Sequence, residues 1–327
     1  MIQHTSLLRP ILLNNGAKMP RIGVGTYLLQ GELCREIVER ALQLGYRHVD
    51  TAHSYENEKD IGVAIHAIER RGNISRKQLF VTTKVNRIYQ HPVDVKLSLE
   101  ESLEDLKSKY VDLLLIHSPW GLKNRGDGDT KPMREDGTFD CYPYDLKATW
   151  RAMEDAVHAG KVKSIGLSNF TEKLTKMILA NARIRPQNLQ FECHAYYQQN
   201  QLKSFCDENQ ISCTAYAPLG APGKPMWHAS EEDSKCKLLE DKTVLDIADK
   251  YERTPAQILL RFLLERNIAV IPKTSSVQRL EENETVFDFD LEGGDVQKLK
   301  RLDRGIRFFL FKQYSHHSYF PQKNEPF

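Results

Sequence analysis

The sequence of 327 residues lacks several features that mark particular classes of protein. Its net charge is only +2 and its acidic and basic residues are interspersed, which argues against a nucleic acid or an acidic membrane surface as partner. No run of about eighteen apolar residues is present, so we expect no membrane span. The amino-terminal residues contain no charged segment followed by a long apolar stretch, so we expect no secretion signal and a cytoplasmic location.

The cysteines also lack a pattern. None of the six stands in a CxxC pair or at a spacing typical of metal ligands. We therefore expect no metal site, and we interpret the cysteines as reduced thiols of a cytosolic protein.

Short strand-like runs and longer helical segments alternate along the chain. Several runs are nearly continuous in Val, Ile and Leu, which is typical of parallel strands covered on both faces. Two amphipathic stretches between them stop at Gly45 and Gly160, which can adopt the left-handed conformation that ends a helix. The count of eight runs favours a (β/α)₈ barrel over a doubly wound sheet, with residues 1–327 as one domain. The runs are 21–26, 47–50, 79–84, 111–117, 162–168, 188–193, 212–216 and 268–273.

Four further segments complete the predicted architecture. Asn15-Gly16 predicts the turn of a β-hairpin at about 9–20, because glycine tolerates a positive φ. Segments of about 118–144 and 217–240, and the tail 308–327, are too long for ordinary connections. Because the first two follow strands, we expect them over the carboxyl-terminal face of the barrel, and the tail can fold over the same face.

Polar residues stand where several predicted strands end. Asp50, Lys84 and His117 end three of them, and Tyr55 follows the first. We expect Asp50 and Lys84 to pair, because buried ions cost several kcal/mol each unless they are paired. A cationic Lys84 near Tyr55 is expected to lower the phenol pKa from about 10, which suits a proton donor to a developing alkoxide. His117 is expected to orient a carbonyl group, and general acid help of this kind gives roughly 10²–10⁴ in rate.

Each of these residues taken singly has an ordinary structural explanation. An aspartate at a strand end is more often a turn former or helix cap, a lone lysine there is usually a solvated rim residue, and a histidine is more often a hydrogen-bonded structural residue. Together these explanations require independent coincidences at one face of the barrel, which favours a site.

The sequence resembles the aldo-keto reductases from the hairpin to about Phe289. The motifs that support the resemblance are GVGTY (23–27), GYRHVDTAHSYENEKDIG (45–62), TTK (82–84), LLLIH (113–117), GLSNF (166–170), LQFECHAYYQQ (189–199), TAYAPLG (214–220) and IPKTSSVQRLEEN (271–283). The resemblance implies an NADPH-dependent reduction of aldehydes and ketones by a catalytic tetrad. Its members are Asp50, Tyr55 as proton donor, Lys84 and His117.

The resemblance also implies an extended nicotinamide cofactor across the barrel mouth. Asn and Gln side chains supply both donors and acceptors for the carboxamide, and Tyr216 is expected to stack on the nicotinamide ring. Lys273 and Arg279 match the family's site for the adenosine 2′-phosphate, so we predict NADPH over NADH. A GxGxxG fingerprint is absent, since Leu28 stands where its last glycine would be. The predicted cofactor residues are Gly25, Thr26, Tyr27, Asp50, Ser168, Asn169, Gln190, Tyr216, Ala217, Pro218, Leu219, Lys273, Thr274, Ser275, Arg279, Glu282 and Asn283.

The substrate pocket departs from the family pattern. Tyr27, Asn86 and Ser118 stand where aromatic residues are frequent, so we expect a more polar and wider pocket than in sugar-aldehyde reductases. The predicted pocket residues are Tyr27, Asn86, His117, Ser118, Trp120, Trp227 and Phe308. The physiological substrate stays open among sugars, aromatic and lipid aldehydes, steroid ketones and xenobiotics.

Three alternatives to a reductase remain. One is a lyase or aldolase in which Lys84 forms a Schiff base with substrate. Another is a non-enzymatic nicotinamide-binding sensor or accessory subunit on the same fold. The last is a structural role of the lens or storage type. Nothing in the sequence requires an oligomer, so we expect a monomer that binds a small-molecule carbonyl substrate.

Overall fold

Eight short segments, most of them apolar, form one parallel sheet in the computed structural model, which describes residues 9–72, 74–222 and 236–321. All eight predicted strands are present, and their order in the sheet follows their order in the chain. The strands are β3 (Val24–Gly25), β4 (His48–Asp50), β5 (Phe80–Val85), β6 (Val111–Ile116), β9 (Val162–Ser168), β10 (Asn188–Glu192), β11 (Ser212–Tyr216) and β12 (Ile268–Val270).

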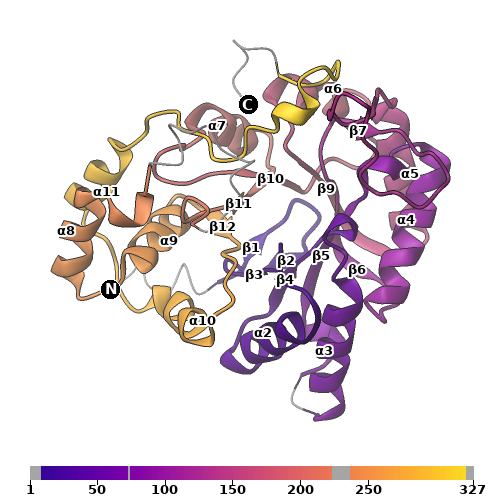
Figure 1. The fold of residues 1–327 in the computed structure, drawn as a ribbon. Coiled ribbons are helices and arrows are strands. Elements are labelled where there is room, and N and C mark those ends of the chain that lie inside the picture. Colours follow the sequence, from indigo (N-terminus) through magenta and orange to yellow (C-terminus); the bar gives the residue numbers. More distant parts are fainter. Residues whose placement is uncertain (1–8, 73, 223–235, 322–327) are drawn as a thin grey trace.

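The first and last strands of this sheet meet, so the sheet closes on itself. Parallel bridges join Ile22 to Val270 and Gly25 to Lys273. Glycine is required at position 25, because a Cβ atom there would lie 2.6 Å from the carbonyl oxygen of Ile271. β12 ends earlier than predicted, since Pro272 has no N–H to continue a ladder. The predicted (β/α)₈ barrel is therefore confirmed (Figure 1).

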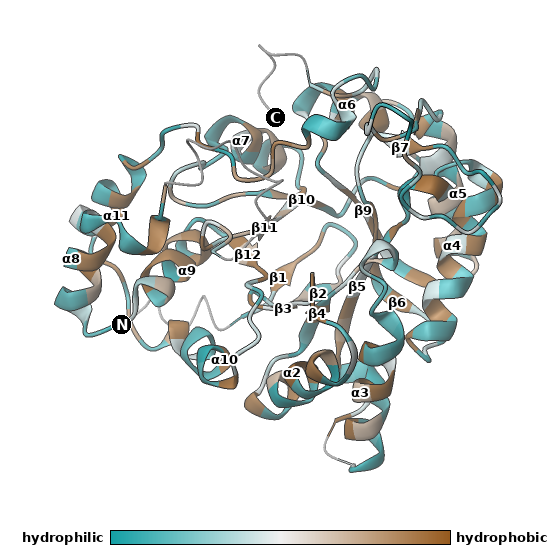
Figure 2. Ribbon diagram, in the orientation of Figure 1, coloured by the Kyte–Doolittle hydropathy of each residue, from teal (hydrophilic) through white to brown (hydrophobic). Residues whose placement is uncertain are grey.

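Helices surround the strands as an outer ring (Figure 1). Figure 2 shows hydrophobic and hydrophilic residues sharing these helices, as expected for elements with one face on the core. No helix in the described ranges is both long and apolar enough to cross a membrane. The helices are α2 (Gly31–Leu44), α3 (Glu58–Arg70), α4 (Pro92–Asp105), α5 (Leu146–His158), α6 (Glu172–Leu179), α7 (Asn200–Glu208), α8 (Lys242–Tyr251), α9 (Pro255–Glu265), α10 (Val277–Glu284) and α11 (Gly293–Lys300).

The helix ends follow local sequence signals. Gly45 ends α2 with a left-handed φ of 111°, and Gly160 follows α5 with a φ of 71°, as predicted. Thr254 caps α9 by accepting the N–H of Gln257, and Pro255 occupies the first turn, where its missing N–H costs nothing.

The predicted hairpin closes the amino-terminal end of the barrel. Its strands β1 (Ile11–Leu12) and β2 (Lys18–Met19) pair antiparallel and cross the middle of the ring in Figure 1. Its turn is tied to the segments just before the strands, since Asn14 donates to the carbonyls of Pro186 and Gln210 at 2.9 and 3.1 Å. We call this end of the barrel the floor. Its apolar cluster contains Ile11, Leu13, Met19, Phe80, Leu113, Leu115 and Ala269.

Long segments cover the opposite, carboxyl-terminal end, which we call the mouth. The segment 118–144 contains a small antiparallel sheet that was not predicted, β7 (Gly121–Leu122) with β8 (Cys141–Tyr142). Its Trp120 is completely buried against Phe311, Tyr314 and Phe320 of the tail. This contact joins the segment 118–144 to the tail. Residues 223–235 of the segment 217–240 lie outside the described residues.

Candidate active site

A buried ion pair lies at the centre of the mouth. Asp50 ends β4, and Lys84 is near the end of the neighbouring strand β5. The Lys84 Nζ atom lies 2.6 Å from Asp50 Oδ1 and donates to the carbonyl of Thr51 at 2.8 Å. Burial lowers the pKa of Lys84, but Asp50 and Tyr55 outweigh it and the net pKa is raised. The predicted pairing is present, and Lys84 stays protonated at neutral pH.

Tyr55 lies beside this pair on the 3₁₀ turn η1 (His53–Tyr55) that follows β4. Lys84 Nζ is 3.5 Å from its hydroxyl oxygen. Burial raises the pKa of Tyr55, and the Lys84 ammonium only partly offsets this, so the net pKa lies above its usual value. The predicted lowering of this pKa is therefore wrong. Removing the phenolate from water destabilises it by more free energy than one neighbouring cation contributes in stabilisation. Tyr55 accordingly holds its proton at neutral pH.

His117 follows β6 and faces Tyr55. The two rings meet edge to face with centroids 5.6 Å apart, and the His117 Nδ1 atom lies 3.2 Å from the hydroxyl of Ser54. Burial, with Arg87 and Lys84 nearby, places the pKa of His117 well below its usual value, so the ring is neutral. Its Nε2 atom has no hydrogen-bond partner in the described part of the chain, and is available to a ligand.

Four polar residues form a connected group at the ends of β9, β10 and β11. The Gln190 side-chain amide donates to Asp50 Oδ2 at 2.7 Å, and its oxygen accepts nothing from the described residues. The Tyr216 hydroxyl donates to Asn169 Oδ1 at 2.7 Å, and Asn169 donates to Ser168 Oγ at 3.2 Å. The open oxygen of Gln190 and the second lone pair of Asn169 Oδ1 fit a ligand amide.

Two cations flank the start of α10. Lys273 and Arg279 are exposed, and neither forms an ion pair within the described ranges. Ser276 caps the helix by accepting the N–H of Arg279 at 3.4 Å, and the Thr274 hydroxyl accepts the N–H of Ser276 at 3.0 Å. Unpaired cations beside a helix amino terminus fit a phosphate group. Of the other residues predicted nearby, Ser275 is exposed, Glu282 is half-buried and Asn283 is buried.

The remaining predicted cofactor residues lie at the same edge. Thr26 donates its hydroxyl to the carbonyl of Asp50 at 2.9 Å, and the Tyr27 ring lies 5.1 Å from that of Tyr55. Ala217, with a φ of 50°, begins a turn directly after β11, closed by the Gly220 N–H at 3.0 Å. This turn also contains Pro218 and Leu219, and Gly25 is at the barrel closure described above.

Two polar residues predicted for the substrate pocket, Asn86 and Ser118, are hydrogen-bonded to other residues behind it. Asn86 and Ser118 are completely buried. The Asn86 amide lies 3.0 Å from His53 Nδ1, and Ser118 Oγ accepts from Arg87 Nε at 2.9 Å. Asn86 and Ser118 therefore lie behind the surface of the mouth and expose no polar group to solvent. Trp120 is buried in the same way.

The tail places Phe309, the residue after the predicted pocket residue Phe308, at the mouth. Phe308, predicted for the pocket, is only 1% exposed and packs on His194. Phe309 is half-buried, and its ring meets Tyr216 edge to face at 5.6 Å. Trp227 lies outside the described residues.

Sequence reasoning did not single out three residues that shape this site. Asn57 donates to the carbonyls of Thr26 and Leu29 at 2.8 and 2.9 Å, which ties η1 to the loop after β3. Ser54 contacts His117, and Arg87 places a cation near it. Ser54 and Asn57 had a signal, since both lie within the motif at 45–62, whereas Arg87 is recognised only through its contacts.

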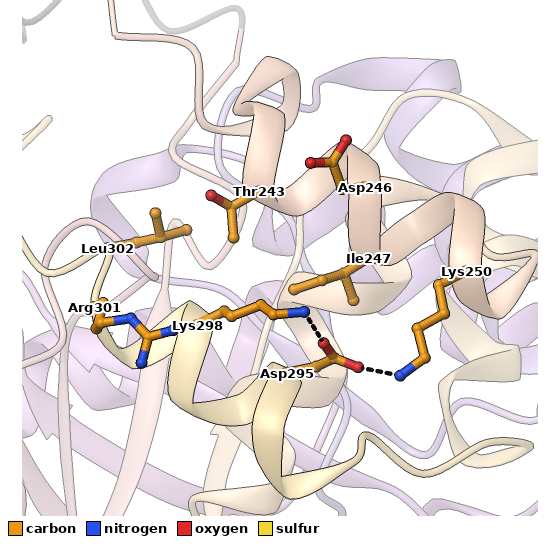
Figure 3. A pocket seen from close by; sticks show the side chains of 8 residues that line it. All are labelled: Thr243, Asp246, Ile247, Lys250, Asp295, Lys298, Arg301 and Leu302. Atoms are coloured by element: carbon orange, nitrogen blue, oxygen red, sulfur yellow. Dashed lines mark hydrogen bonds and ion pairs between the residues drawn. The ribbon is translucent and has the colours of Figure 1, made fainter.

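A separate hollow of about 280 Å³ lies outside the barrel, between α8 and α11 (Figure 3). Asp295 lies between Lys250 and Lys298 and accepts from each at 2.7 Å. Because these charges already satisfy one another, the hollow offers no reactive group comparable to those at the mouth.

Comparisons with known proteins agree with this geometry. A model described as the aldo/keto reductase family matches residues 21–304. Aldo-keto reductase family 1 member A1 of Bos taurus is 40% identical over 301 residues, covering 92% of this chain and 91% of the relative. The Homo sapiens protein of the same name is 40% identical over 302 residues, with 92% and 91% covered. The solved structure of the aldose reductase from Schistosoma japonicum has a TM-score of 0.89 at 37% identity, covering 97% of this chain and 99% of that one.

Proposed function

Because this chain belongs to the aldo/keto reductase family, we propose that it reduces aldehydes and ketones to alcohols with NADPH, and that Tyr55 supplies the proton. The protein is an oxidoreductase that acts on carbonyl groups of small molecules. The observation that most directly supports Tyr55 is its contact with Lys84 at 3.5 Å, while Lys84 is held 2.6 Å from Asp50.

The chain's own residues handle the proton and the carbonyl. NADPH, when bound, would supply the hydride that reduces the carbonyl carbon. Tyr55 transfers its proton to the carbonyl oxygen, which completes the alcohol, and the Lys84 ammonium compensates the phenolate that remains. The neutral His117 donates from Nε2 to the carbonyl oxygen and so orients it, because Nδ1 is engaged by Ser54.

The polar groups at the strand ends hold the cofactor in this proposal. Ser168, Asn169 and Gln190 would hold the carboxamide, and Tyr216 would hold the nicotinamide ring. Lys273 and Arg279 bind the 2′-phosphate, and their lack of carboxylate partners in the described part of the chain supports NADPH over NADH.

The alternatives receive less support. A Schiff-base mechanism needs an unprotonated lysine, but Asp50 and Tyr55 raise the pKa of Lys84. A non-enzymatic nicotinamide-binding role has no support from the relatives, which are named as reductases. We further propose that the chain acts as one domain, as a monomer and in the cytoplasm, consistent with six free cysteines.

Tyr55→Phe tests the proposed function. NADPH absorbance is followed with a panel of aldehydes and ketones, and NADPH binding is measured separately. We expect kcat to fall roughly 10²–10⁴-fold while the Kd of NADPH stays the same, because only the transferable proton is removed. Tyr251→Phe is the matched control, since its hydroxyl bonds Asp295 at 3.1 Å on the outer surface, and its kcat should be unchanged.

Two outcomes would contradict the proposal. Full kcat in Tyr55→Phe would mean that another group supplies the proton. Tight NADPH binding by the wild type without oxidation across the panel would favour the non-enzymatic role.

A further inference from the structure

The last residue of β10, Glu192, is a buried carboxylate that the proposed reaction does not use. Its side chain is 1% exposed at the edge of the mouth, beside Tyr216 of the neighbouring strand. A buried carboxylate is strongly unfavourable unless donors satisfy its oxygens, so its partners indicate what it holds.

The partners of Glu192 are the backbone of the tail, one histidine and one arginine. The N–H of Phe308 donates to Oε1 at 2.5 Å and the N–H of Phe309 donates to Oε2 at 3.1 Å. His194 Nε2 lies 3.2 Å from Oε1, and Arg307 Nε lies 3.9 Å from Oε2. Burial raises the pKa of Glu192, but His194, Arg307 and the Phe308 N–H outweigh it and the net pKa is lowered. The carboxylate therefore stays ionised and accepts from two consecutive amides.

These two amides set the direction of the aromatic tail. Phe308 points into the core, and Phe309 meets Tyr216 with ring centroids 5.6 Å apart. The next aromatic residue in contact is Phe311. Its ring centroid lies 6.1 Å from that of Phe309 and 5.4 Å from that of Trp120. The tail thus crosses from the side of α11 to the segment that contains β7 (Figure 1).

β10 also carries Gln190, one of the residues proposed to bind the cofactor. Gln190 and Glu192 are two residues apart on β10, so their side chains leave the same face of the sheet. Gln190 contacts Asp50 of the central ion pair, and Glu192 contacts the tail. One strand therefore contacts both the reacting centre and the tail.

We propose that Glu192 is a positioning residue that determines substrate specificity. By holding the amides of Phe308 and Phe309, it fixes the Phe309 ring beside Tyr216. There the ring forms one wall of the site for carbonyl substrates with a flat aromatic body. The inference rests on the proposed carbonyl reductase activity. A small aliphatic aldehyde does not extend to this wall and does not depend on Glu192.

Glu154 offers a matched control at the other end of the barrel. It is completely buried on α5, and its Oε1 accepts the N–H groups of Arg183 and Ile184 at 2.6 and 2.8 Å. Its Oε2 also accepts from Arg183 Nε at 2.8 Å. Glu154 thus holds two consecutive amides as Glu192 does, but far from the mouth.

The test compares Glu192→Gln with Glu154→Gln. Steady-state kinetics with NADPH are measured for 4-nitrobenzaldehyde and for propanal, together with amide hydrogen exchange. A glutamine keeps one acceptor and turns an NH₂ donor toward the second amide. We expect Glu192→Gln to raise the KM for 4-nitrobenzaldehyde by roughly tenfold or more, because a charged acceptor is lost, with both propanal parameters within about twofold. Faster exchange of the Phe308 and Phe309 amides should accompany it.

The control and a second background separate positioning from general damage. Glu154→Gln should lower Tm without changing the ratio of the two KM values. In a Phe309→Ala background, Glu192→Gln should have no further effect on the KM for 4-nitrobenzaldehyde. If Glu192→Gln does not fold, Glu192→Asp retains the charge one methylene farther from the amides and should show the same substrate dependence at smaller size.

Different results would contradict the role of Glu192 and the proposed function. Equal changes for both aldehydes, or no change while the tail amides exchange faster, would overturn the role of Glu192. A wild type that reduces neither aldehyde would instead contradict the proposed function itself.

Discussion

The floor of the barrel is closed by Ile11, Leu13 and Met19 of the hairpin, whereas the mouth buries the charges of Asp50 and Lys84. Apolar burial at the floor stabilises the fold without directional requirements, at about 25 cal/mol per Å². Burial at the mouth costs several kcal/mol per ion and is offset only by specific partners. The comparison shows that stability and chemistry come from opposite ends of one sheet, so substitutions at the two ends should separate them.

Lys84→Met should have the largest effect, because it leaves Asp50 buried without its cation. We expect a loss of about 3–5 kcal/mol in the free energy of unfolding, measured with urea, and loss of turnover. The double variant with Asp50→Asn removes both charges and should regain most of the stability but none of the activity. An equally stable Lys84→Met protein would show that the pair does not hold the mouth together.

Met19→Ala probes the floor. Met19 is fully buried, and its truncation should cost about 2–5 kcal/mol of unfolding free energy through a cavity. At temperatures where the variant is folded, kcat should match the wild type. Leu12→Ala in the same hairpin is the control, since Leu12 is 68% exposed and should change stability by under about 0.5 kcal/mol. A large fall in kcat for Met19→Ala would show that catalysis at the mouth depends on packing at the floor.

Arg279→Ala removes a cation from the edge of the mouth without breaking an ion pair in the described part of the chain. The Kd of NADPH should rise roughly ten- to a hundredfold, because a charged hydrogen bond to phosphate is lost. The weaker Kd of NADH should not change, since NADH has no 2′-phosphate. Fluorescence titration measures both, and an unchanged Kd of NADPH would exclude Arg279 from the phosphate site.

Asp295→Asn probes a buried carboxylate between α8 and α11, outside the barrel, where the smallest effect is expected. Hydrogen bonds from Lys250 and Lys298 lower the pKa of Asp295 to about 2. Its contribution to stability is therefore present above the unfolded pKa of about 4 and lost as pH falls toward about 2.

The expected loss in Asp295→Asn at pH 7 is about 1 kcal/mol, because both lysines are partly exposed. Urea unfolding at pH 7 and at pH 3 should show this difference shrinking at the lower pH. Asp246→Asn, which breaks only the exposed pair with Lys242, should be nearly neutral at both. A difference that does not depend on pH would contradict the assignment.

The positions of Asp50, Lys84 and His117 were predictable because the carboxyl ends of parallel strands meet at one face. The pairing of Asp50 with Lys84 followed from the cost of an unpaired buried charge. The contacts of Ser54, Asn57 and Glu192 were not predictable, because their partners are backbone groups or a neutral ring, and no buried opposite charge identifies them.

The sequence by itself determined the eight strands, the hairpin and the residues at the strand ends, because these depend on local periodicity and on which side chains follow each strand. Only the tertiary structure decided the direction of the Tyr55 pKa, since that depends on how much water the surrounding segments exclude. It also decided that Phe309 and not Phe308 meets Tyr216, because one buried carboxylate from a distant strand sets the path of the tail.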